Sequence, residues 1–460
     1  MISSSRHLDV CNQRPPRRSG STQLTKLIGF LVSVGIVVAM WWAGAADSHA
    51  NYPGIAFSFT DDDSGGIALT VVDAQTGDVT PPKRIFDSKR CRKPLKVRRA
   101  KNGFLAVTNI AEDQPALFVV NPERRGDNRQ LRLPGVPDEC RFIGNVALVT
   151  CDDDSLAIVD TRTNRIHVNQ LDETLVPPAN GPEDICLSPN NQYAVVSFQK
   201  DSKKGKKLGS RLAIFELPQV KLVADLQLPR NRPELHVEGN LKEQGPGPEV
   251  IHISNSTDTL TTTLDLYGGV GLLNWSAAKA GRLESWTTVS TSPQNSWGTA
   301  FPDRATLFTY DDRDLLFVCN AGVNGGCCLI DLALRRVIWR HQVPPGLEAP
   351  VYIPALKSAY SVCSGKVKQR LRNTIVKHVE PRKILVHFDF TNLNQPHVET
   401  IQLPVYTTQI RATSLAPPML LIAGGTSKQK PNELISFDPV ENVIKDRELF
   451  DAGRIFRFER

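Results

Sequence analysis

The sequence lacks the short motifs that carry many hydrolytic, nucleotide-binding and redox sites. It contains no G-x-S-x-G, no H-E-x-x-H, no phosphate-binding loop and no C-x-x-C. These absences exclude, in that order, the nucleophile turn of serine hydrolases, the zinc-binding helix of metalloproteases, a nucleotide-binding phosphate loop and a thioredoxin-type dithiol. The nine histidines form no pair at metal-ligand spacing. Any catalytic site must therefore be assembled from residues that lie far apart in the chain.

The chain also has little excess charge. Its 55 lysines and arginines face 48 acidic residues, which gives a net charge of +7 over 460 residues. Residues 1–50 hold five of the basic and two of the acidic residues, so the charge falls to +4 without them. Such a small excess argues against a nucleic-acid partner.

Only one long apolar run is present, from Leu27 to Ala46, with basic residues before it and Asp47 after it. This pattern is typical of an export signal, and small residues favour cleavage after Ala50. Residues 1–50 are therefore predicted to be a leader, and 51–460 the mature domain, periplasmic or secreted. The alternative is an uncleaved N-terminal anchor, because the run is long enough to span a bilayer. Contact with a membrane would then be made through this segment alone.

A β-branched run that ends in a polar residue, then a turn and another strand, recurs eight times in the remaining sequence. Successive copies lie 39 to 58 residues apart, a spacing that suits the four-stranded blade of a propeller with loops of varying length. The polar residues that end these runs are Asp73, Asn121, Asp160, Glu216, Asn274, Asp331, Asp389 and Asp438.

Each of these runs follows another apolar strand, and most units also show a strand before that one and a strand after the turn. The first unit lacks its leading strand, whereas the C-terminal segment AGRIFRFER is a strand without a blade of its own. We predict an all-β fold with a single β-propeller of about eight four-stranded blades, seven being the alternative count. Residues Arg454 to Phe458 are expected to pair into the first blade and close the ring.

Two segments resemble known propeller repeats. LSPNNQYAVVSF from Leu187 is similar to the surface-layer and YVTN-type bacterial repeats in its Ser-Pro-Asn turn, and LAIVDTRTNRI from Leu156 resembles their third strand. The likeness implies the fold of the YVTN and WD-repeat-like propeller superfamily. It implies no activity, because these families include adhesion, scaffold and enzyme members.

A partial likeness to the eight-bladed quinoprotein alcohol dehydrogenases comes from Cys327-Cys328 and from the Asp-x-x-Thr-Gly step at Asp73 to Gly77, with Pro81 in the position of the repeat's tryptophan. In that family the adjacent cysteines form a disulfide beside the quinone. The alternative is that both are small apolar residues opening a strand. Eight cysteines remain after the leader, and we expect at most one or two disulfides.

The longest insertions are predicted to share one face of the ring, where loops between second and third strands meet the connections between blades. They are residues 199–211, 230–249 and 364–383. Excess loop length on one face of a rigid scaffold is typical of a binding surface, although solvated charged hairpins are the alternative. The candidate partner-binding residues are Lys203, Lys204, Lys206, Lys207, Lys366, Lys368 and Arg370.

Acidic residues recur where inner strands are predicted to begin, at the mouth of the central channel. If they converge on the axis, their oxygens would suit calcium, the one cofactor that we consider. The alternative is that they cap turns and face water. The candidate metal ligands are Glu139, Glu183, Glu249 and Glu348.

The sequence therefore favours an exported binding scaffold that engages a protein or an extracellular polymer on the face with the 199–211 and 364–383 insertions. The alternative is an enzyme, either a quinone-dependent oxidoreductase or a calcium-dependent lactonase-like hydrolase. No residue can be assigned a catalytic role.

Overall fold

The computed structural model describes strands and loops of one compact unit, Asp47–Arg460. The described residues are 57–58, 67–69, 76–79, 83–86, 94–100, 105–109, 115–121, 127–153, 155–170, 180–200, 208–229, 245–292, 299–371, 374–413, 417–425, 433–449 and 457–458. No helix among them has the length and apolar character needed to cross a membrane, and the predicted span 27–46 lies outside them.

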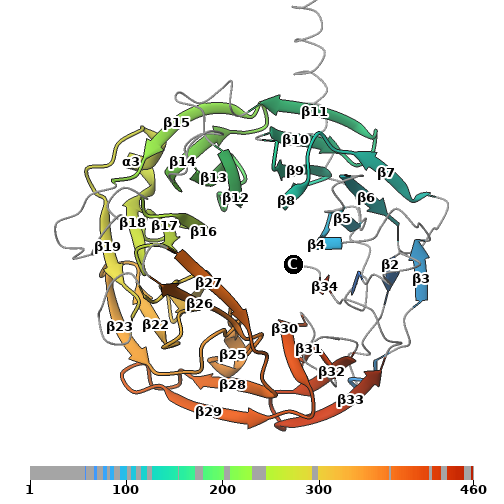
Figure 1. The fold of residues 1–460 in the computed structure, drawn as a ribbon, viewed down its shortest axis with the longest axis vertical. Helices are drawn as coiled ribbons and strands as arrows, with labels where there is room; N and C mark the ends of the chain where they lie inside the picture. Colours follow the sequence, from blue (N-terminus) through green and yellow to red (C-terminus); the bar gives the residue numbers. More distant parts are fainter. Residues whose placement is uncertain are drawn as a thin grey trace, which may run out of the picture. The chain divides into compact units, whose positions relative to one another are not determined.

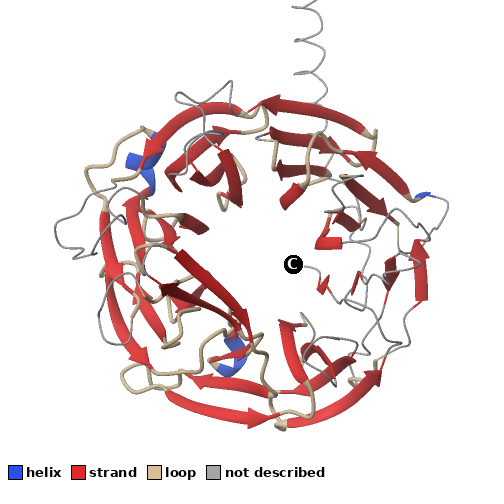
Figure 2. Cartoon of the chain, viewed as in Figure 1, coloured by secondary structure: helices blue, strands red, loops and turns tan. Residues whose placement is uncertain are grey.

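Antiparallel sheets arranged around a central axis make up this unit, and nearly every regular element is a strand (Figures 1 and 2). Seven sheets have four strands each, in the order inner, second, third and outer that the sequence predicts. Their inner strands are β4 (Pro94–Arg99), β8 (Pro137–Ile143), β12 (Asn180–Leu187), β16 (Pro248–Ser254), β20 (Arg304–Tyr310), β24 (Val351–Ile353) and β30 (Tyr406–Ala412).

We number these sheets as blades 2 to 8. The second strands of blades 2 to 8 are, in order, β5 (Leu105–Asn109), β9 (Val146–Cys151), β13 (Tyr193–Lys200), β17 (Thr259–Leu264), β21 (Arg313–Cys319), β25 (Ser358–Val362) and β31 (Leu420–Gly425). The third strands, in the same order, are β6 (Ala116–Val120), β10 (Ser155–Asp160), β14 (Leu208–Glu216), β18 (Gly269–Asn274), β22 (Cys327–Asp331), β28 (Ile384–Asp389) and β32 (Glu433–Asp438). The outer strands are β7 (Arg129–Arg132), β11 (Arg165–Gln170), β15 (Lys221–Gln227), β19 (Thr287–Ser290), β23 (Arg336–His341), β29 (His397–Gln402) and β33 (Val443–Leu449).

Blade 1 combines both ends of the unit. The C-terminal strand β34 (Arg457–Phe458) pairs with β1 (Phe57–Ser58), and β2 (Ile67–Leu69) pairs with β3 (Lys83–Phe86). The inner position belongs to β34, which contacts the inner strands β4 and β30 of the two neighbouring blades. The eight-bladed ring and its closure by the C-terminal strand are thus confirmed.

The recurring polar residue at the end of each third strand has a local cause. Asp160, Asp331, Asp389 and Asp438 each accept a backbone N–H from a residue two or three positions later, at 2.8 to 2.9 Å. Such side-chain caps stabilise the turn into the outer strand. The polar residue therefore recurs in the sequence because the same capped turn recurs between the third and outer strands.

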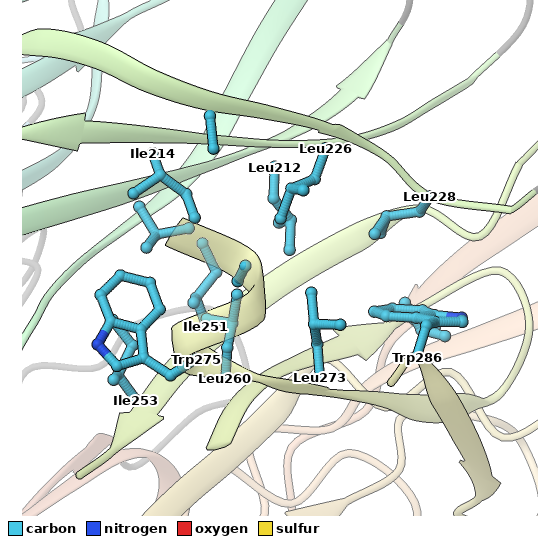
Figure 3. Packing of buried hydrophobic residues seen from close by; sticks show 14 of the residues in the cluster. Leu212, Ile214, Leu226, Leu228, Ile251, Ile253, Leu260, Leu273, Trp275 and Trp286 are labelled. Atoms are coloured by element: carbon cyan, nitrogen blue, oxygen red, sulfur yellow. The ribbon is translucent and has the colours of Figure 1, made fainter. Parts of the chain in front are cut away.

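Apolar side chains fill the space between neighbouring blades, as Figure 3 shows for blades 4 and 5. Leu212 and Ile214 of β14 belong to one apolar cluster with Ile251 of β16 and with Trp275, which opens the short helix α3 (Trp275–Lys279). Trp286 covers Gly271 so closely that a Cβ there would lie 2.0 Å from its ring. Blade 5 therefore needs glycine at this position of β18.

Blade 7 carries a short 3-10 helix, η3 (Pro354–Leu356), and one large insertion. Between its second and third strands the chain forms an additional hairpin, β26 (Lys366–Leu371) and β27 (Thr374–Val379). This hairpin is a two-stranded sheet separate from the blade, and it runs towards β16 in Figure 1. It is the predicted insertion 364–383.

Candidate functional site

The hairpin β26–β27 lies on the face where loops between second and third strands meet the connections between blades. The backbone N–H of Lys368 donates to Ala321, in the loop between β21 and β22 of blade 6. Arg370 donates to the carbonyl of Leu266, in the equivalent loop of blade 5, and its guanidinium lies 5.5 Å from the ring centre of Phe301. The hairpin of blade 7 therefore extends over blades 6 and 5.

Inner strands of four blades begin with the same irregularity. A one-residue bulge follows the first proline of β4, β8, β12 and β16. In three of these blades a hydroxyl of the second strand accepts the bulge's N–H: Thr150 from Glu139, Ser197 from Asp184 and Thr263 from Val250. Bulges re-aim side chains, and here they fix where the acidic residues near the axis lie.

Ion pairs then join one inner strand to the next. Glu139 accepts hydrogen bonds from Arg98 of blade 2 and, at 2.7 Å, from Arg141. Arg141 also lies 3.3 Å from Asp184 of blade 4, and Asp184 accepts the backbone N–H of Ile251 in blade 5 at 3.0 Å. Alternating charges thus link blades 2, 3 and 4, and the backbone hydrogen bond of Ile251 extends the link to blade 5.

The remaining predicted acids also lie among the inner-strand starts. Glu348 of blade 7 accepts a hydrogen bond from Arg304 of blade 6 at 2.9 Å, and Lys366 lies 3.6 Å from it. Glu183 is half-buried in the bulge of β12. The structure brings arginine or lysine side chains to Glu139, Glu249 and Glu348.

The ammonium of Lys368 forms the centre of the most concentrated charge cluster on this face. Its Nζ lies 2.9 Å from Asp265, 3.2 Å from Asp303 and 3.4 Å from Glu249. Lys368 is 8% exposed. Burial lowers its pKa, but the three carboxylates outweigh burial and raise the pKa above the usual value. The amine therefore stays charged.

This cluster, Lys368–Glu249–Asp265–Asp303, holds more negative than positive charge. One oxygen of Asp303 is buried without a hydrogen-bond partner among the described residues. Burial and the neighbouring Asp265 raise the pKa of Glu249 to about 8, although Lys368 opposes the shift. Burial also raises the pKa of Asp265. The carboxyl group of Glu249 therefore titrates at a higher pH than an ordinary glutamate.

A pH-dependent stability follows from Glu249. Its folded-state pKa lies above the unfolded value, so the native state holds a proton that the unfolded chain loses, and stability falls as pH rises from about 5 to 9. Glu249→Gln removes this titration. We expect the melting temperature to fall less between pH 6 and pH 9 in this variant than in the natural protein, by on the order of a few degrees.

The matched control is Glu216→Gln, at an exposed residue that ends β14. Its melting curve should keep the pH dependence of the natural protein. Equal pH dependence of all three proteins would show that Glu249 does not titrate in this range.

The other sequence-based candidates stand as follows. Lys203, Lys204, Lys206 and Lys207 lie outside the described residues. Lys366 is exposed, whereas Lys368 and Arg370 make the internal contacts given above. No group of three or more His, Cys, Asp or Glu side chains in the described ranges has an arrangement that could hold a metal ion. The calcium site stays a prediction.

All seven cysteines that the structure describes are free thiols. Cys327 and Cys328 open the third strand of blade 6 and are buried on its two faces, each against a different apolar cluster. Burial raises the pKa of Cys328 to about 12. These thiols therefore lack the thiolate character that reactive cysteines need.

Asp265, Asp303 and Arg304 were not predicted from the sequence. Asp265 follows a second strand, and 103 residues separate it from Lys368. A usable signal was present nonetheless: an acid and an arginine lie within two residues of each other near the start of an inner strand, as in Glu139 and Arg141 or Asp303 and Arg304. Opposite charges at these recurring positions indicate pairing between blades.

Comparisons with known proteins show the fold alone. No protein-family model matches the chain, and no curated protein matches it. Among solved structures, the dihydro-heme d1 dehydrogenase NirN in complex with DHE has a TM-score of 0.61 at 12% identity, with 89% of this chain and 77% of that chain covered. The computationally designed Ika8 protein has a TM-score of 0.50 at 8% identity, covering 79% and 89%.

These likenesses support a propeller fold for the chain. Identities of 8 to 12% transfer no ligand and no reaction. The chain is an eight-bladed β-propeller.

Proposed function

We propose that this propeller is an exported binding scaffold and that it engages a protein partner on the face covered by the hairpin β26–β27. Export rests on the apolar run 27–46 and the small residues before Asn51. The binding role rests on the way in which the hairpin is held.

The observation that carries the proposal is the internal anchor of an inserted segment. A hairpin that only connected two strands would need no contact with other blades. This one inserts Lys368 between three carboxylates of blades 5 and 6, and Ile375 packs on the apolar cluster shared by blades 4 and 5. Buried ion clusters add little net stability, but they fix one arrangement of the groups that form them.

The anchored hairpin presents basic groups to solvent. Lys377 and Arg382 are exposed, and Lys366 keeps 58% of its side chain accessible. The segment 364–383 contains seven basic residues and one acidic residue. A rigid, basic surface on the insertion-bearing face favours a partner with an acidic surface, because complementary charge raises the rate of association and selects among partners.

The test is affinity capture from an extract of the cells that make the protein, followed by mass spectrometry. The double variant Lys377→Glu and Arg382→Glu should lose a protein that the natural chain retains. The control, Lys221→Glu with Arg336→Glu, makes the same change of charge at exposed residues of outer strands and should retain it.

Identical sets of retained proteins for both double variants would place the function elsewhere. Enrichment of an anionic polymer without any protein would replace the protein partner by the polymer.

A further inference from the structure

The hairpin β26–β27 has one occupied and one open edge. On one side β26 forms a bridge from Lys368 to Gly322 of blade 6, so its edge is covered. On the other side, within the described part of the chain, β27 pairs with β26 alone. Lys377, His378 and Val379 of this strand are exposed, and Val379 is 67% accessible.

Backbone groups along the open edge can be assigned from two hydrogen bonds. Lys368 donates its N–H away from β27, to Ala321, and Glu380 donates to Gly365 across the base of the hairpin. Residues in an antiparallel pair alternate between hydrogen-bonded and non-hydrogen-bonded positions. Lys368 and its cross-strand partner Lys377 therefore form a non-hydrogen-bonded pair.

The alternation places the N–H and C=O of Ile375, Lys377 and Val379 on the outer side of β27. No hydrogen bond from these backbone groups to another described residue is present outside the hairpin. Three successive outward residues supply a row of donors and acceptors, which is the template that an added strand uses.

Charge selects the kind of strand that fits this edge. A second copy pairing edge to edge would set the Lys377 side chains of both copies close together, and like charges in such positions are destabilising. An acidic residue opposite Lys377 is favourable for the same reason. Arg382, exposed just beyond the strand, extends the basic surface.

We propose that β27 recruits its partner by β-strand addition, taking an extended, acidic segment as the third strand of the β26–β27 sheet. This inference rests on the proposed binding function and specifies the partner's chemistry. The segment lies antiparallel to β27, with an acidic side chain opposite Lys377 and main-chain hydrogen bonds to Ile375, Lys377 and Val379.

The experiment uses a defined probe, a fluorescein-labelled peptide that repeats Glu-Val four times, with binding followed by anisotropy. Lys377→Pro removes one outward N–H, a donor that the hairpin itself does not use, and proline is tolerated at such an edge. We expect it to weaken binding about tenfold, whereas Lys377→Thr, which keeps the backbone donor, should weaken it about threefold. Matching melting temperatures of the two variants would show that the hairpin is intact.

Backbone pairing is tested separately on the peptide. In the proposed register the glutamate opposite Lys377 exchanges both main-chain hydrogen bonds, so N-methylation of the glutamates should abolish binding and N-methylation of the valines should spare it. A block peptide, four glutamates followed by four valines, controls for charge alone.

Strand addition is overturned if Lys377→Pro and Lys377→Thr bind the peptide equally, or if both methylated forms bind as well as the parent. If the charge-reversed double variant loses the cellular partner but Lys377→Pro still captures it, the binding face is supported and strand addition at β27 is refuted. Equal capture by every variant would refute the proposed function itself.

Discussion

Replacing Lys368 with methionine is expected to destabilise the propeller by about 3 to 5 kcal/mol. Methionine keeps the length and the apolar stem of lysine, so the loss isolates the ammonium. Without it, Glu249, Asp265 and Asp303 remain buried near one another with no central cation. The free energy of unfolding from urea titration, or the melting temperature, measures the effect.

The matched control is Lys366→Met, on the same strand but with 58% of the lysine side chain exposed and 3.6 Å from Glu348. Lys366 is screened by solvent and Glu348 keeps its ion pair with Arg304, so the loss should be about 0 to 1 kcal/mol and this variant should resemble the natural protein. Equal stability of the two methionine variants would contradict the proposed role of Lys368.

A second variant separates charge from packing. Lys368→Met combined with Glu249→Gln, Asp265→Asn and Asp303→Asn removes every charge of the cluster, and it should recover much of the loss because buried ion clusters are often replaceable by neutral groups. Trypsin supplies a local measurement. Release of the hairpin in Lys368→Met alone should speed cleavage within 366–383, where lysine and arginine are frequent.

The scaffold was predictable because its signals are local. A third strand that ends in aspartate, as at Asp160 or Asp331, repeats because that aspartate caps the turn into the outer strand within two or three residues. The missing first strand and the surplus last one then identify the closure. Each inference uses residues that are near in sequence or a simple count of strands.

The site was less predictable because its contacts are distant in sequence. The sequence places Lys368 in a basic loop, which suggests exposure, but its carboxylate partners Asp265 and Glu249 lie 103 and 119 residues earlier. The hairpin could extend into solvent or fold over its neighbours with the same local pattern. Its direction is set by the acids of blades 5 and 6, and no local pattern records that pairing.

The inner-strand acids show a third situation, in which the sequence suggests where the acids lie but does not identify the side chains that pair with them. Glu139 lies in β8 and Glu348 lies just before β24, and both are buried. Their partners are Arg98 and Arg304, each from the preceding blade. A carboxylate can accept hydrogen bonds from an arginine or bind calcium, and the spacing of acids in the sequence does not distinguish these roles.

The second large loss of stability is expected from removing the strand that closes the ring. A chain that ends at Ala452 lacks β34, the strand that pairs with β1 and contacts both β4 and β30. Its loss leaves the edge of β1 unpaired and removes the contacts of blade 1 with the inner strands of both neighbouring blades. We expect the melting temperature to fall by several degrees or more, with aggregation on heating, because the blades no longer support one another around a closed circle. A chain that ends at Phe458 retains β34 and should melt as the full chain does.

A cross-link keeps this prediction testable if the truncated chain fails to fold. Phe57 and Phe458 are directly opposite in the β1–β34 pair. Cysteines at both positions should therefore form a disulfide, because directly opposed residues in an antiparallel pair lie within the 4.4 to 6.8 Å that a disulfide requires, roughly, between α-carbons. The bond would close nearly the whole chain into one loop, so the oxidised form should melt above its reduced form, since long loops lose the most unfolded-state entropy. Failure of the two cysteines to cross-link in the folded protein, together with unchanged melting of the chain that ends at Ala452, would show that the ring is not closed by its C-terminal strand.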